Sequence, residues 1–356
     1  MKLDVIQRRN MGITLRLIMY GVLIALVYPA FQDGFSSANP YINALFIGSI
    51  GGLFIAFCEL DLFRNKKVFN SFTLRVVIKT LVYFVAFSIL IPLVKLIGDS
   101  IYNGQGIGEH YRSQEYQTFL FDEDLDIMLG YAFFFICVII FMREMSLKLG
   151  QGVLWNYITG KYHKPKFENR LFMYIDIRDS TKISEKLKGI EFHGFIDEFI
   201  RDLTPVILDF RGIIYRYVGD QLSITWKQGD GIRNANCIKA FIAAQNTIRR
   251  NREKYLHRYG VVPKFIASLH YGPVVIGQLG DVKSQIVYIG ETVHRLGRIE
   301  SQFKAADLPS PILLSGQVLE QLRLPALFEV RKLGSLEGVK EQINVFTLIE
   351  NVIDKP

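Results

Sequence analysis

Residues 212–226 read GIIYRYVGDQLSITW, two runs of β-type residues on either side of Gly219 and Asp220. A Gly-Asp pair between such runs suits a tight hairpin turn. An earlier run, RLFMYIDI at residues 170–177, is a short apolar segment that predicts a buried strand with Asp176 at its end. These segments place one acid at the end of a strand and another in a turn, and they decide the fold of this half.

The segments around them alternate between helical and strand-like patterns. Residues 179–187 begin with the helix-capping types Asp179, Ser180 and Thr181, and residues 192–210 have helical spacing. Residues 232–260 predict one long amphipathic helix, and residues 264–280 predict a second hairpin around Tyr271-Gly272-Pro273. Further strands are expected at residues 285–290, 311–315 and 342–350, and a helix at residues 292–303. Helices mixed with hairpins indicate an α+β sandwich rather than a doubly wound parallel sheet.

The other half of the 356-residue chain is dominated by apolar runs. Half of all residues are hydrophobic, and residues 13–147 contain most of the long apolar stretches. The net charge of +8 comes from basic residues beside these runs and along one predicted helix, which favours a membrane surface over nucleic acid. Cys58, Cys137 and Cys237 have neither metal nor disulfide spacing and read as buried small residues.

Four stretches are long enough to cross a bilayer: residues 13–31, 43–63, 76–97 and 125–142. The third is interrupted by Lys79, Pro92 and Lys95, and we expect both lysines to reach the interface from near its ends. Glu59 and Asp61 fall at the end of the second stretch, where an interfacial role is expected.

The distribution of lysine and arginine predicts the orientation. The N-terminal tail, the loop after the second stretch and the segment after the fourth are rich in basic residues, whereas the other two loops contain only Arg112. The positive-inside rule therefore predicts a multi-pass protein of the cell (inner) membrane with both termini in the cytoplasm.

We predict four regions along the chain. These are a four-helix transmembrane domain (1–147), a linker or coupling segment (148–168), a catalytic domain (169–350) and a C-terminal tail (351–356). The linker is interpreted either as a coupling element or as a passive tether. The acidic loop between residues 98 and 124 offers a further hypothesis, that the membrane half receives a cation or peptide ligand.

Asp176 and Asp220 are the two acids that stand out by position. Each is flanked by apolar residues on a strand expected to be buried, where an unpaired carboxylate is costly. A divalent cation held near phosphate oxygens would relieve that cost, and the start of the helix after Asp176 offers free N–H groups to a triphosphate. Taken singly, each acid is better explained as a helix cap or an ordinary turn aspartate than as a metal ligand.

The ordered set of motifs resembles the class III adenylate and guanylate cyclases over residues 168–350. The matching segments are FMYIDIRDSTKISEKL (172–187), YRYVGDQLSITW (215–226), LHYGPVVIGQLG (269–280), VYIGETVHRLGRIES (287–301), SGQVLEQL (315–322) and LGSLEGVKEQINVFTLI (333–349). The four-span arrangement is similar to that of bacterial membrane cyclases. The resemblance implies a ferredoxin-like α+β catalytic domain after an α-helical transmembrane bundle.

The resemblance also implies a lyase that converts ATP to 3′,5′-cyclic AMP and pyrophosphate in a head-to-tail homodimer. Asp176, Asp220 and the Ile177 carbonyl would hold two Mg²⁺ or Mn²⁺ ions per active site. Arg298 would stabilise the reacting phosphate from the other subunit, through its planar fork of donors. Asp179, Ser180 and Thr181 would lie beside the substrate phosphates.

Three residues differ from the usual pattern of the family, and a fourth has two possible roles. His294 stands where the family usually has asparagine, which is compatible either with a replacement hydrogen-bond donor or with weakened catalysis. Arg216 and Val287 stand where adenylate cyclases usually have lysine and aspartate or threonine, so guanine and pyrimidine nucleotides stay alternatives to ATP. Lys340 is assigned either to the terminal phosphates or to an exposed turn. A catalytically weak, nucleotide-binding signalling module is the alternative function. The remaining histidines, including His193, His257 and His270, are interpreted as surface or satisfied core residues.

Overall fold

The computed structural model divides into two compact units, residues 1–148 and 149–356, each described by itself below. It describes residues 5–32, 34, 37–63, 71–121, 123–150, 152–303, 308, 310–324, 328–336 and 342–350. Lys340, the basic loop after the second stretch and the tail from residue 351 lie outside these ranges, as does the start of the N-terminal tail.

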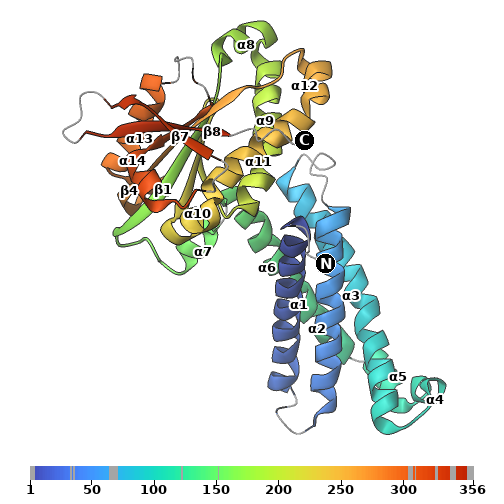
Figure 1. The fold of residues 1–356 in the computed structure, drawn as a ribbon. Helices are drawn as coiled ribbons and strands as arrows, with labels where there is room; N and C mark the ends of the chain where they lie inside the picture. Colours follow the sequence, from blue (N-terminus) through green and yellow to red (C-terminus); the bar gives the residue numbers. More distant parts are fainter. Residues whose placement is uncertain are drawn as a thin grey trace, which may run out of the picture. The chain divides into compact units, whose positions relative to one another are not determined.

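The first unit is built from helices that run side by side (Figure 1). Four of its helices are long and apolar enough to cross a membrane, as predicted from the four apolar stretches. Its elements are α1 (Val5–Gln32), α2 (Asn39–Phe57), a π-helical turn (Cys58–Leu62), α3 (Phe72–Asn103), α4 (Ile107–Tyr111), α5 (Gln114–Phe121) and α6 (Glu123–Leu149).

Glycines bring α1 and α2 into close contact. A Cβ on Gly21 would lie 2.5 Å from the carbonyl oxygen of Gly48, and one on Gly52 would lie 2.6 Å from the Cα of Ile18. Small residues of this kind let membrane helices approach backbone to backbone. Pro92 does not end the third helix, because α3 continues on both sides of it, and the carbonyl oxygen of Pro92 accepts a 2.9 Å hydrogen bond from the Tyr116 hydroxyl.

The expectation that Lys79 reaches the interface is wrong. Lys79 is 3% exposed, and its Nζ lies 2.8 Å from Glu59 Oε1 and 2.7 Å from Glu144 Oε1. Glu59 also accepts from the Tyr83 hydroxyl and pairs with Arg143, so it is a buried partner rather than an interfacial acid. Two buried carboxylates, Glu59 in the π-helical turn after α2 and Glu144 on α6, favour a lysine that pairs with both over one that reaches water.

The second unit is an eight-stranded sheet with helices on both faces, in agreement with the predicted α+β class (Figure 1). The strand order is β2-β3-β1-β4-β6-β8-β7, with β5 paired to β4, and only β4 and β6 run parallel. The strands are β1 (Lys166–Ile177), β2 (Ile213–Val218), β3 (Gln221–Lys227), β4 (Phe265–Leu279), β5 (Gln285–Ile289), β6 (Ile312–Ser315), β7 (Phe328–Ser335) and β8 (Asn344–Glu350). The helices are α7 (Val153–Ile158), α8 (Ser180–Leu187), α9 (Gly189–Asp209), α10 (Gln228–Ile232), a 3₁₀ turn (Arg233–Ala235), α11 (Asn236–Arg250), α12 (Arg252–Tyr259), α13 (Glu291–Phe303) and α14 (Gly316–Gln321).

Strand alternation divides the core of this unit into two layers. On β1, Leu171, Met173 and Ile175 pack with α9 and α11, whereas Phe172 and Tyr174 belong to a cluster that includes Leu296 of α13. Successive side chains of a strand point to opposite faces, so a single strand serves both layers. The position of a residue along β1 therefore determines which of the two helix layers its side chain faces.

The predicted second hairpin is wrong, because β4 is one continuous strand. It pairs with β1 from Lys166 opposite Ile276 to Ile177 opposite Phe265. Gly272 serves another purpose: a Cβ there would lie 2.6 Å from Thr292 Oγ1, which donates a 2.7 Å hydrogen bond to the carbonyl oxygen of Pro273. Gly272 thus marks a close approach of α13 to the strand rather than a turn.

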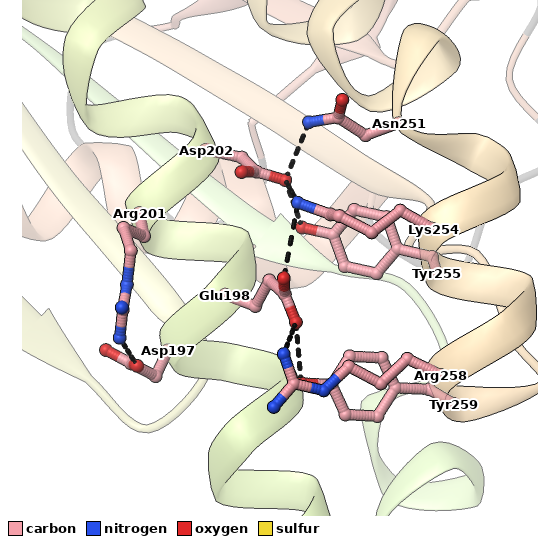
Figure 2. A network of polar contacts seen from close by, with 9 residues as sticks. All are labelled: Asp197, Glu198, Arg201, Asp202, Asn251, Lys254, Tyr255, Arg258 and Tyr259. Atoms are coloured by element: carbon pink, nitrogen blue, oxygen red, sulfur yellow. Dashed lines mark hydrogen bonds and ion pairs between the residues drawn. The ribbon is translucent and has the colours of Figure 1, made fainter. Parts of the chain in front are cut away.

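The single long helix predicted for residues 232–260 is also divided. A 3₁₀ turn precedes α11, and Asn251 separates α11 from α12. Asn251 and the Tyr255 hydroxyl both donate to Asp202 Oδ2 of α9, at 2.9 and 2.8 Å, and Tyr259 donates to Glu198 at 2.8 Å (Figure 2). These contacts to α9 determine the direction of α12 after the break.

The segment predicted as a linker is partly folded into the second unit. The Tyr157 hydroxyl donates a 2.9 Å hydrogen bond to the Ser284 carbonyl oxygen, and the Tyr162 carbonyl accepts one of 2.9 Å from the Gln278 amide. Strand β1 then begins at Lys166, ahead of the expected domain boundary at residue 169. Residues 153–168 are therefore attached to the edge formed by β4 and β5.

Candidate active site

Asp176 is the penultimate residue of β1 and is 4% exposed. Alternation along the strand places it on the same face as Phe172 and Tyr174, the face covered by α13. A buried carboxylate at the end of a strand requires compensation by hydrogen bonds or a cation. The next residue, Ile177, is fully buried in the opposite layer.

Asp220 lies in the two-residue turn between β2 and β3, as predicted. Gly219 before it has a φ of +60°, a left-handed conformation that glycine adopts readily. Strand β3 pairs with β1 up to Ile175 opposite Leu222, and continuing this register by one position sets Asp176 beside Gln221. Asp176 and Asp220 therefore lie at the same end of two adjacent strands.

One carboxylate oxygen of Asp220 is orphaned. Its Oδ2 is buried and has no hydrogen-bond partner among the described residues. Within that same part of the chain, no cluster of three or more histidine, cysteine or acidic side chains is arranged to hold a metal. Mg²⁺ is commonly bound by one or two carboxylates and completed by water and substrate phosphates, so a two-acid set with an unsatisfied oxygen fits such an ion.

A cleft of about 710 Å³ opens beside Asp220. Ser180 and Thr181 from the first turn of α8 line it together with Asp220, so the structure brings these three predicted residues together. The volume is within the range of small-molecule sites. The start of α8 also contributes backbone N–H groups that have no partner within the helix.

Asp179 behaves differently from its predicted role as a side-chain cap. It precedes α8 with a φ of +54°, makes no capping hydrogen bond, and accepts a 2.8 Å bond from Lys182 Nζ instead. That hydrogen bond and the charge of Lys182 hold the pKa of the Asp179 carboxyl below its usual value. Its left-handed backbone is incompatible with the extended geometry from which a cap residue normally bonds.

His294 and Arg298 lie on one side of α13, separated by one helical turn, and both are exposed. Leu296 and Ile299 on the other side are fully buried against the sheet and anchor the helix. Helix α13 packs in the layer opposite α9, whereas the Asp220 cleft is lined by α8 and α9. A single chain thus presents His294 and Arg298 in one layer and the cleft residues Ser180, Thr181 and Asp220 in the other.

Arg216 and Val287 lie on two different strands of the sheet, β2 and β5. Arg216 is exposed on β2, after an irregularity in its pairing with β3, and lies opposite Ser223. Val287 is half-buried on β5, opposite Gly277 of β4. Neither side chain is placed in the cleft beside Asp220.

Three features of the site were missed by sequence reasoning. His193, interpreted as a surface residue, is exposed and lines the Asp220 cleft together with Tyr217. Arg178 follows the strand with its Nε and Nη2 buried and without hydrogen-bond partners among the described residues. Arg178 could have been found from the sequence, because it lies two residues after Asp176. His193 could not, because its place in the cleft depends on how α9 packs.

The other two histidines agree with their interpretation. His257 is exposed on α12. His270 is buried on β4, with its Nδ1 2.8 Å from Ser315 Oγ, and burial followed by the charge of Arg295 lowers its pKa to about 4. It is a satisfied core residue.

Comparison with known proteins identifies this fold. A solved bacterial light-regulated adenylyl cyclase superposes with a TM-score of 0.53 at 18% identity, over 62% of this chain and 64% of that chain. The second unit has the class III cyclase fold. Its mixed sheet carries helices on both faces, as the resemblance implied, and this unit follows four apolar helices that are consistent with N-terminal spans.

Sequence comparison agrees with this fold. This chain is 30% identical over 212 residues to adenylate cyclase 2 of Rhizobium meliloti, and the match covers 59% of this chain and 58% of the relative. It is 26% identical over 183 residues to an adenylate cyclase of Anabaena cylindrica, over 49% of this chain and 35% of the relative. The match thus spans less than two thirds of either relative. No family model matches the sequence.

Proposed function

We propose that this protein is a membrane-bound class III adenylate cyclase that converts ATP to 3′,5′-cyclic AMP and pyrophosphate. The observation that supports the proposal is that Asp176 and Asp220 lie at the same end of two adjacent strands, with Asp220 Oδ2 buried and without a hydrogen-bond partner among the described residues. The fold and the similarity to bacterial adenylate cyclases support the same assignment.

The metal-binding residues in this proposal are Asp176, Asp220 and the carbonyl of Ile177. Two Mg²⁺ or Mn²⁺ ions bound there would supply electrostatic stabilisation of the reacting phosphoryl group. Ser180, Thr181 and the free N–H groups of α8 bind the triphosphate in the cleft beside Asp220. The 3′-oxygen of the ribose bonds to the α-phosphorus while the bond to the bridging β-phosphate oxygen breaks, which releases pyrophosphate and the hydroxyl proton.

Arg298 acts from a second copy of the chain in this proposal. It is exposed on α13, one turn from His294, and both face away from the core of their own subunit. A head-to-tail homodimer would bring α13 of each copy to the acids of the other. The guanidinium then stabilises the developing phosphate charge and His294 donates a hydrogen bond to the substrate.

ATP is the first choice of substrate, and GTP and pyrimidine triphosphates are the alternatives. Val287 on β5 lacks an acceptor for the adenine amino group, and Arg216 is exposed on β2, where its donors suit carbonyl acceptors. The base is therefore selected by the assembled dimer rather than by a complete pocket in one chain.

We further propose that the four apolar helices span the inner membrane with both termini in the cytoplasm. The helices have the required length and apolarity, and the basic residues of the sequence flank the ends assigned to the cytoplasm. This orientation exposes the cyclase domain to cellular ATP.

The decisive test is cyclic nucleotide formation by the full-length protein in membranes, with Asp176→Asn and Asp220→Asn as variants. Both should abolish product, because each removes a charge from the metal site. Asp230→Asn is the matched control, since Asp230 is in α10 after the opposite end of β3 and pairs with the exposed Arg211. Activity that survives both site variants would overturn the assignment.

The second candidate is a nucleotide-binding module with weak turnover. His294 at the position of the family asparagine is the observation that favours it. Nucleotide binding by the purified dimer without product, at saturating ATP and metal, would establish this alternative.

A further inference from the structure

The membrane domain contains a cavity of about 460 Å³ that the proposed chemistry does not use. All four long helices contribute to its wall, each with a stripe of residues three or four positions apart. On α3 this stripe runs Phe87, Ile91, Lys95 and Asp99, which changes from apolar to charged along the helix. The volume lies in the range of small-molecule binding sites.

The other helices repeat the same gradient. On α2 the stripe changes from Ile47 and Gly48 to Asn43 and Asn39, and on α6 it changes from Phe135 to Asp124. Every polar group lies toward the end of the domain where α1 and α3 finish and α2 and α6 begin. The cavity is therefore apolar in its depth and polar at its mouth, which matches an elongated ligand with one polar head.

The polar end is organised around Asp99, which is 2% exposed. Its Oδ1 accepts hydrogen bonds of 2.8 Å from Asn39 and 2.7 Å from Asn43, and its Oδ2 lies 3.0 Å from Lys95 Nζ. Gly98 makes room for this arrangement, because a Cβ there would collide with Asn43 Oδ1. A charged group this deeply buried in an apolar bundle, with partners from two helices, marks a functional site by default.

The charge balance at the mouth selects the sign of the ligand. Asp99, Glu115 and Asp124 line the cavity, against the single cation Lys95, which is already paired with Asp99. Glu115 and Asp124 are exposed and lie on α5 and α6. The described wall therefore has an excess of two negative charges above an apolar interior.

We propose that this cavity binds an organic cation, an amine with an apolar body. The ammonium group lies between Glu115 and Asp124 at the mouth, and the apolar body extends along Ile91 and Phe87. An acidic mouth raises the local concentration of cations, and apolar walls retain the body of the ligand. The site is independent of the cyclase active site.

The test uses the full-length chain in nanodiscs and three probes that share one body: 4-phenylbutylamine, 4-phenylbutanol and 4-phenylbutyrate. Binding is measured by calorimetry, with empty nanodiscs subtracted to remove partition into lipid. The amine should bind saturably, more tightly than the alcohol, and the carboxylate should bind weakest. Higher salt should weaken the amine alone, because its contacts at the mouth are exposed.

Two variants test separately the acidic mouth of the cavity and its apolar wall. Glu115→Gln with Asp124→Asn changes only exposed groups and should weaken amine binding by roughly 3- to 10-fold while leaving the alcohol unchanged. Ala132→Phe places a ring in the cavity wall and should abolish binding of both. Lys148→Met, outside the cavity on α6, is the control and should bind like the parent chain.

Four results would overturn the proposal. They are no saturable amine binding above empty nanodiscs, carboxylate binding as tight as that of the amine, an affinity indifferent to the Glu115 and Asp124 changes, or a co-purified lipid in the cavity that the amine does not displace. The last result would assign the cavity to a membrane lipid.

Discussion

The side chain of Gln221 donates a 2.7 Å hydrogen bond to Glu300 Oε2. Gln221 follows Asp220 directly, and Glu300 is on α13, two residues after Arg298. The contact therefore joins the turn that carries one proposed metal ligand to the helix that carries the proposed transition-state arginine. In a head-to-tail dimer, the spacing of these two elements within each chain determines how well both active sites assemble.

Gln221→Leu should lower kcat by about tenfold, because a hydrogen bond to a charged group contributes about 1.5 kcal/mol. KM for ATP should change less, since the lost contact positions α13 rather than binding the triphosphate. Gln228→Ala, after the opposite end of β3, is the control and should retain full activity. An unchanged kcat in Gln221→Leu would show that this contact does not position the site.

Two inactive variants should complement each other. In a mixed dimer of Asp220→Asn and Arg298→Ala chains, one site combines intact acids from one subunit with the intact arginine of the other. Random mixing of equal amounts should restore about a quarter of the activity, because half of the dimers would each have one complete site. The measurement is cyclic nucleotide formation by co-expressed, doubly tagged chains. Activity that stays at the level of the separate variants would contradict shared sites.

Lys79→Met should destabilise the membrane domain strongly. It leaves the buried carboxylates of Glu59 and Glu144 without their common partner, an effect that costs about 3 kcal/mol or more for a buried pair. Thermal unfolding of the full-length protein in detergent should show a lower transition temperature. Adding Glu144→Gln should restore part of the loss, whereas Lys148→Met at the exposed end of α6 should have little effect. Equal transitions for Lys79→Met and the parent chain would refute a stabilising network.

His270 should make the cyclase domain less stable in mild acid. Burial, and then Arg295, lower its pKa from 6.5 to about 4, while Glu291 acts in the opposite direction. As the pH falls from about 6.5 to about 4, His270 is therefore protonated in the unfolded chain but stays neutral in the folded chain. This difference removes up to about 3 kcal/mol of stability across that window.

The measurement is denaturant unfolding of the full-length protein at several pH values, followed by tryptophan fluorescence, which changes as the fully buried Trp226 becomes exposed. His270→Gln should lose less stability than the parent chain between pH 6.5 and 4. His257→Gln changes an exposed residue and should retain the parent slope. Identical slopes for the parent and His270→Gln would contradict the depressed pKa.

Local patterns predicted the positions of the two acids and the four long apolar helices. Asp220 was found because Gly219-Asp220 between β-type runs specifies a turn, and the helices because span length is a property of continuous sequence. These features depend on residues near each other in the chain. The fold class and the places of these two acids in a strand and a turn therefore followed from sequence alone.

Except for Asp179, whose partner Lys182 is three residues away, the errors involve contacts between distant residues. Gly272 resembled a turn residue, but its purpose is to admit Thr292, twenty positions later. Lys79 resembled an interfacial lysine, yet its partners Glu59 and Glu144 are 20 and 65 residues away. Asn251 ends α11 where its side chain reaches Asp202. Such pairings appear only when the packing of whole elements is known.

The most direct test of the central claim is incubation of the full-length protein in membranes with ATP, GTP, CTP and UTP separately, with Mn²⁺ or Mg²⁺, and mass spectrometry of the products. We expect a 3′,5′-cyclic nucleotide and an equal amount of pyrophosphate, with ATP as the best substrate, and no product after chelation of the metal. Absence of any cyclic product from all four triphosphates, with the protein folded and the metal present, would contradict the account.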